Sequence, residues 1–121
     1  MTLSACWSAG ACQRPNPAPD VTFEWTLAPE RPVVGPAVLT LRVLDRDRRP
    51  LRAVDLRVEA HMSHPGMAPL LAATRERAIG VYDAELQFSM RGDWILLISG
   101  SLANGATLRH RIDVSNVRPP G

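Results

Sequence analysis

The segment 61–67 concentrates side chains that could hold a metal ion, in the order HMSHPGM, with two of the chain's three histidines and two of its four methionines. Imidazole nitrogen and thioether sulfur are neutral donors that suit soft ions, Cu(I) above all. Pro65-Gly66 fits the central positions of a type II β-turn, which brings the first and fourth Cα atoms within about 7 Å. The spacing therefore points His64 and Met67 toward one region and predicts a soft-metal site there.

A structural interpretation of the same residues stays open. Pro-Gly is also an ordinary way to end a strand, and methionine fills irregular gaps in cores. Side chains alternate between the two faces of a strand, so Met62 is predicted to face inward and His61 outward. The same phase makes Met90 inward at the far end of the strand 82–88. Met62 and Met90 are thus either metal donors or residues that close one end of the core.

The elements that must position these residues are short strands. Apolar and polar residues alternate with a period of two from residue 21 onward, and no stretch sustains a helical period. The run 94–98 is instead apolar on both faces, which indicates a central strand. The expected strands cover residues 21–27, 39–43, 54–60, 82–88, 94–98 and 108–114, and the stretch 71–78 is a short strand or a crossing loop. Turn signals separate them, so we predict an all-β fold, an immunoglobulin-like antiparallel β-sandwich of about seven strands.

The N-terminal region differs in composition from the rest. Residues 1–20 are expected to be a tail or spacer, with three prolines between residues 13 and 20, before a domain over 21–117. The sequence LSAC at 3–6 resembles a lipoprotein cleavage site but lacks the preceding charged start and apolar stretch. It is either a truncated lipoprotein signal, with a lipid anchor at Cys6, or a chance match. Cys6 and Cys12 form a disulfide or stay free thiols.

Composition argues against several functions. All fourteen basic residues are arginine, the net charge is +2, and no basic stripe is interleaved with aromatics, so nucleic-acid binding is not expected. No apolar run approaches the roughly 20 residues of a membrane-spanning helix. Nucleophile triads, paired carboxylates and phosphate loops are missing, and Ser63 is too close in sequence to its histidine neighbours to form a triad. We therefore expect no catalytic residues. His110 holds an inward phase, and a buried neutral imidazole is favoured over a ligand role there.

Three segments of the sequence, the first of them within 61–67, resemble those of a known family. They are MSHPGM at 62–67, GVY at 80–82 and FSMRGDW at 88–94, in an order that resembles the YtkA-like domain family and the related FixH proteins. The likeness covers about residues 21–115, and the hairpin at 88–94 is its most specific part. Unlike FixH proteins, this sequence has no membrane helix.

The resemblance implies an immunoglobulin-like sandwich outside the cytoplasm, often a lipoprotein or membrane-anchored. It also implies a link to copper or heavy-metal handling and to assembly of haem-copper oxidases. By this resemblance Met62, Met67 and Met90 fall on the family's methionine positions, and His61 and His64 are local additions.

Two functions follow as hypotheses. The first is a periplasmic or otherwise extracytoplasmic module that binds Cu(I), with donors from His64 and Met67 and, further, from Met62, Met90 and His61. The alternative is a metal-independent interaction module whose turn contacts a membrane complex, such as a respiratory oxidase or a metal efflux system.

Overall fold

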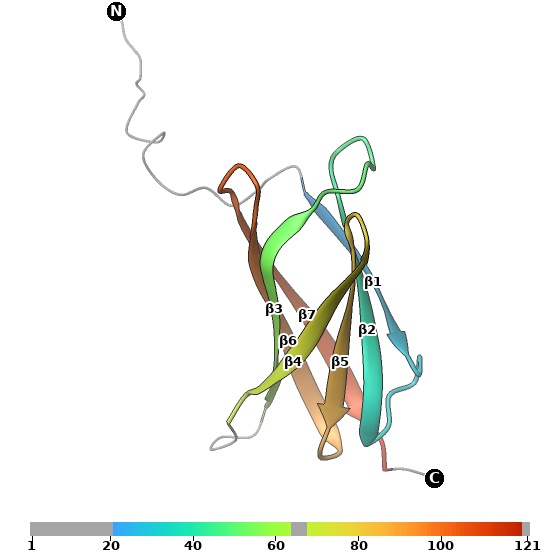
Figure 1. Cartoon of the computed structure of the whole chain (residues 1–121). Coiled ribbons are helices and arrows are strands. Elements are labelled where there is room, and N and C mark those ends of the chain that lie inside the picture. The colour runs from blue at the N-terminus through green and yellow to red at the C-terminus, as the bar shows by residue number, and fades with distance from the viewer. Residues whose placement is uncertain (1–20, 64–67, 120–121) are drawn as a thin grey trace, which may run out of the picture.

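The computed structural model describes residues 21–63 and 68–119 of the chain. The strands are β1 (Thr22–Ala28), β2 (Gly35–Leu44), β3 (Ala53–Met62), β4 (Leu70–Ala78), β5 (Val81–Phe88), β6 (Gly92–Leu102) and β7 (Thr107–Val117). The all-β prediction is confirmed (Figure 1). Over these ranges, no helix is long and apolar enough to cross a membrane.

The strands follow the order β1-β2-β5-β4-β3-β6-β7, and every neighbouring pair is antiparallel. The weakly patterned stretch predicted as a strand or a crossing loop is β4. Its first residues, 70–72, pair with β3, and the residues from 73 onward pair with β5. β4 therefore passes from one layer of the sandwich to the other, and its side chains do not keep one buried face.

The core lies between the layers and is built by strict alternation. In β5, the residues Tyr82, Ala84, Leu86 and Phe88 are buried, and the polar residues between them are not. The largest fully buried side chains are Trp94 and Phe88, whose rings meet edge to face at 5.4 Å. Each large apolar side chain buried in this way contributes about 1.5–3 kcal/mol. Among the residues in the described ranges, the buried side chains are hydrophobic, and that of Tyr82 also carries a hydroxyl group.

The two ends of the strand order, β1 and β7, form a seam along one side of the molecule. At one end of the seam, Val34 donates its N–H to the carbonyl of Arg118 at 2.8 Å, beside a short parallel bridge between Val33 and Arg118. Toward the other end, the rings of Phe23 in β1 and His110 in β7 stack at 5.0 Å. Within the described part of the chain, β1 and β7 have no hydrogen-bonded register with each other.

Candidate functional site

The methionine-bearing segments of the described chain meet at one end of the sandwich. Met62 is the last residue of β3 and pairs with Trp94 of β6. Ser63 then donates its N–H to the carbonyl of Asp93 at 3.3 Å. The end of β3 is therefore next to the start of β6 and to the β5–β6 turn, which contains Met90. Figure 1 shows the end of β3 and this turn at the same end of the molecule.

Met62 faces inward, as its phase predicts, and belongs to the core with 9% of its surface exposed. Its terminal methyl lies against the turn, since a Cβ built on Gly92 would be 3.3 Å from it. Gly92 also has φ +125°, a conformation that favours glycine. Packing thus explains the position of Met62, and the sulfur is largely covered.

The prediction that Met90 faces inward is wrong. β5 ends at Phe88, and Met90 lies in the following turn with 45% of its surface exposed. Alternation between faces applies only while the strand continues, and the turn that ends at Gly92 interrupts it. The backbone of Met90 is nevertheless fixed, because its carbonyl accepts a hydrogen bond from the Nε1 of buried Trp94 at 3.0 Å. Its thioether is accessible from solvent.

His61 faces outward, as predicted. β3 pairs regularly with β6 across His61 and Met62, so the two side chains leave opposite faces of the strand. The Nε2 atom of His61 lies 3.0 Å from the Oε1 atom of Glu59 on the same outer face. His61 therefore has a carboxylate neighbour and points away from the sulfur of Met62.

His64 and Met67 lie outside the described residues, so the turn predicted at Pro65-Gly66 stays a prediction. The connection that carries them leaves β3 after Met62, at the end of the sandwich that holds Met62 and Met90 (the methionine end). Across residues 21–63 and 68–119, no group of three or more His, Cys, Asp or Glu side chains is arranged to hold a metal ion.

His110 is half-buried in its inward phase and stacks on Phe23 with an angle of 18° between the rings. Burial lowers the pKa of its imidazole below the ordinary value. The favoured interpretation was a buried imidazole or a position near the rim of the sandwich, and the structure places the ring half-buried against the ring of Phe23.

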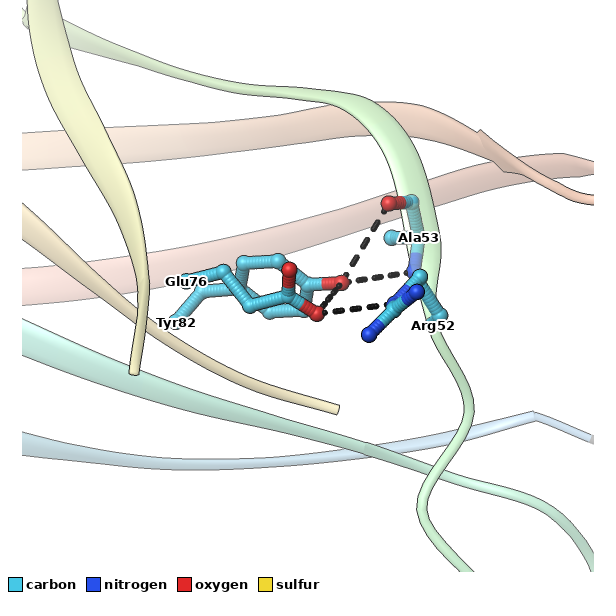
Figure 2. Close-up of polar contacts among 4 residues, drawn as sticks. All are labelled: Arg52, Ala53, Glu76 and Tyr82. Carbon is cyan, nitrogen blue, oxygen red and sulfur yellow. Dashed lines mark hydrogen bonds and ion pairs between the residues drawn. The ribbon is translucent and has the colours of Figure 1, made fainter. Parts of the chain in front are cut away.

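Tyr82, in the GVY segment, ties the two layers together on the far side from the methionines. Its hydroxyl accepts the N–H of Ala53 at 2.7 Å and lies 3.2 Å from the Ala53 carbonyl and 3.4 Å from the Oε2 of Glu76 (Figure 2). Arg52 donates its Nε–H to the same Glu76 oxygen at 3.1 Å. Burial raises the pKa of Tyr82. These contacts position the start of β3 and give Tyr82 a structural role.

Sequence reasoning missed a groove at the seam. It has a volume of about 470 Å³ and is lined by Trp25, Thr26, Leu27, Glu30, Pro32, Asp113, Val114 and Ser115. Trp25 pairs with fully buried Leu41 and shares the inward phase of Leu27, yet 42% of its surface is exposed. The alternating pattern of β1 is that of an ordinary core strand. The groove becomes visible only from the strand order, in which β1 has no hydrogen-bonded neighbour on the side facing β7.

Comparison with known proteins is consistent with this architecture. The crystal structure of a DUF4426 family protein from Pseudomonas aeruginosa is similar, with a TM-score of 0.63 and 10% sequence identity over 90% of this chain and 100% of that chain. This likeness concerns the fold alone. Among curated proteins, none matches this sequence. The model of the YtkA-like family matches residues 17–99, more than half of the chain. The chain therefore belongs to the YtkA-like family.

Proposed function

We propose that this protein is an extracytoplasmic metal-handling module that binds Cu(I) at the methionine end of the sandwich. One observation carries the proposal: Met62 and Met90, far apart in sequence, come from two segments held together by the Ser63–Asp93 hydrogen bond. The segment that contains His64 and Met67 follows Ser63 directly in the sequence. In this proposal, soft donors from the end of β3, from the connection after it and from the β5–β6 turn would share one end of the sandwich.

The expected donors differ in accessibility. Met90 offers an exposed thioether on a fixed backbone, and Met67 and His64 would add sulfur and nitrogen from the neighbouring connection. Met62 would contribute only if its largely covered sulfur is reached from the end of the core. His61 lies on the opposite face of β3 from Met62, beside Glu59. In this proposal it would be a peripheral donor. Thioethers carry no charge and no proton, so these sulfur donors favour Cu(I) and tolerate low pH better than thiolates do.

Family membership supports the cellular context of this proposal. The resemblance to YtkA-like domains implies an extracytoplasmic module that is associated with copper handling and with the assembly of haem-copper oxidases. A periplasmic protein with a lipid anchor at Cys6 would carry the site close to membrane partners, across the proline-containing spacer of residues 13–20. The cargo in this proposal is the metal ion, and no other cofactor is needed.

Anaerobic titration with Cu(I) against a chromogenic chelator tests the site. We expect the double variant His64→Ala/Met67→Leu to lose at least about tenfold in affinity, which corresponds to about 1.4 kcal/mol. Met90→Leu should lose affinity in the same direction, because leucine keeps the apolar volume but has no sulfur. His110→Gln, at the seam, is the matched control and should bind as the wild type does.

Equal Cu(I) affinity in the wild type and the double variant would sink the proposal. Met62→Leu separates a donor role from packing, since leucine preserves a core side chain of similar size. If the domain instead binds a membrane complex equally well with a strong copper chelator present, the metal-independent interaction module becomes the better hypothesis.

A further inference from the structure

The seam between β1 and β7 exposes two strand edges. β1 and β7 stand at the two ends of the strand order, so each has a hydrogen-bonded neighbour on one side only. Alternate residues of an edge strand direct their N–H and C=O groups away from the sheet, where another extended chain can pair with them. The bridge at Val33 and the Phe23–His110 stack bound the seam, and the groove lies between them.

The floor of the groove is aromatic and apolar. Trp25 turns its inward-phase side chain into the groove beside Leu27 and Val114. A tryptophan at an inward position is normally covered by the facing layer. No described strand pairs with the free edge of β1, and 42% of the surface of Trp25 is exposed. An indole face in this position attracts a cationic side chain.

The charges along the groove are acidic. Glu30 and Asp113 line it, and none of its lining residues in the described part of the chain is basic. Among the described residues, Glu30 has no ion-pair partner, whereas Asp113 accepts a hydrogen bond from the Nε of Arg111 at 2.9 Å. Both members of that pair are mostly exposed, so the pairing is weak and easily exchanged for another cation.

We propose that the groove receives an extended segment of a partner protein, which pairs with the edge of β1 and places an arginine or lysine on Trp25 between Glu30 and Asp113. Main-chain hydrogen bonds would hold the segment, and the cation–π contact and the carboxylates would select its basic residue. The volume of about 470 Å³ suits one long side chain with the backbone on either side.

We assign the groove to a partner, because its indole and two carboxylates complement a basic side chain. The segment 13–20, which precedes β1, has proline at 15, 17 and 19, so only one of its two strand edges could offer a full set of N–H donors. This inference does not rest on the proposed metal function, because none of Met62, Met90 and His61 lines the groove.

The test uses the full chain, labelled with ¹⁵N, and two synthetic peptides of seven residues, the length of β1. Both peptides alternate threonine and valine, and the central residue is arginine in one and glutamate in the other. We expect the arginine peptide to shift the amide resonances of β1 and of residues 113–115, and to bind at least about fivefold more tightly than the glutamate peptide. Copper is left out, so failure of the metal proposal does not affect the result.

Variants of the protein identify the groove as the binding site. Trp25→Ala and Glu30→Gln should each weaken the arginine peptide at least about threefold, and Glu30→Gln changes an exposed side chain that the fold does not need. Glu85→Gln, an exposed carboxylate on the outer face of β5, is the matched control and should have no effect.

Several outcomes would overturn the proposal. Absence of shifts in β1, equal affinity for the two peptides, or unchanged binding in both groove variants would each do so. Shifts in the same amides caused by Arg14→Glu without any peptide would assign the groove to the N-terminal segment. Concentration-dependent shifts without peptide would assign it to a second copy of the chain, which also contradicts the proposal.

Discussion

At the scale of single residues, the buried hydroxyl of Tyr82 shows how this small core tolerates a polar group. Its oxygen accepts the N–H of Ala53 and can donate to the carbonyl of the same residue, so one hydroxyl satisfies the backbone at the start of β3. Tyr82 sits on β5 in the other layer. The contact therefore fixes the distance between the layers at this end, where Figure 2 shows Glu76 and Arg52 covering it.

Removal of that hydroxyl should be costly. Tyr82→Phe leaves the partly buried Ala53 N–H without its acceptor, which we expect to lower the free energy of unfolding by about 1–3 kcal/mol. Urea denaturation of the variant and the wild type measures the loss. Thr40→Val is the control: it removes the hydrogen bond from Thr40 to Asp83 at 2.8 Å, but water can reach Asp83, so the cost should stay below about 1 kcal/mol. Equal costs in the two variants would contradict the role given to Tyr82.

The residues of the candidate site show how far alternation predicts a structure. His61 and Met62 were predicted correctly on opposite faces, because β3 continues through both without a bulge. Met90 was placed wrongly, because the strand phase was extended beyond Phe88 into a turn. Phase is a local property of paired backbone, and the sequence does not state where pairing stops.

At the scale of elements, the β4–β5 turn packs on the segment that leads into β3. Gly80 has φ +75°, and its carbonyl accepts the N–H of Val43 at 2.8 Å. A Cβ on Gly80 would lie 2.7 Å from the Cβ of Pro50 and 3.0 Å from the backbone nitrogen of Leu51. The turn and the segment at 50–51 must therefore approach more closely than any other residue type allows.

Comparison of two glycines tests this close approach. Gly105 has φ +89° in the β6–β7 turn, and a Cβ there meets nothing within 4 Å. We expect Gly105→Ala to cost about 1–2 kcal/mol for the left-handed backbone alone. Gly80→Ala should cost about 1–3 kcal/mol more, because the clash adds to the same backbone strain. Thermal and urea unfolding of both variants measure the difference, and a Gly80→Ala variant as stable as Gly105→Ala would refute the close approach.

The element that sequence reasoning described least well was β4. Its polar and apolar residues do not alternate cleanly, because the strand pairs with β3 first and with β5 afterwards. A strand that changes layers has no single buried face, so periodicity weakens although the backbone remains fully extended and paired. The other strands stay within one layer, and their alternation predicted them within a few residues.

At the scale of the whole molecule, the nearly closed strand order leaves one seam, and this seam could not be predicted from local pattern. Phe23, Trp25 and Leu27 alternate in the same way, yet of these three only Leu27 is buried. Which strand is an edge depends on pairings between residues far apart in sequence. For the same reason, the sequence predicted a sandwich but gave no sign of the groove.

The stack of His110 on Phe23 links β7 to β1, the two ends of the strand order. Protonation of His110 should therefore lower the stability of the whole seam. Burial lowers the pKa of His110 in the folded state below the ordinary value of 6.5, and no hydrogen bond to the ring from any described residue offsets this effect. Between the two pKa values the unfolded chain binds more protons than the folded one. The contribution of His110 to stability is therefore complete above about pH 6.5 and is lost as the pH falls through the folded-state pKa.

Urea unfolding from about pH 7.5 down to about pH 5 measures this dependence. The wild type should lose stability more steeply with acid than His110→Gln, in which that histidine no longer titrates while the carboxylates are unchanged. Hydrogen exchange adds a spatial control. Acid should increase exchange at the β1 amides, after correction for intrinsic rates, more than in β3 and β6, because among the described strands β1 is hydrogen-bonded to β2 alone and meets β7 at the stack. Parallel pH profiles in the wild type and the variant would show that the stack does not respond to protonation.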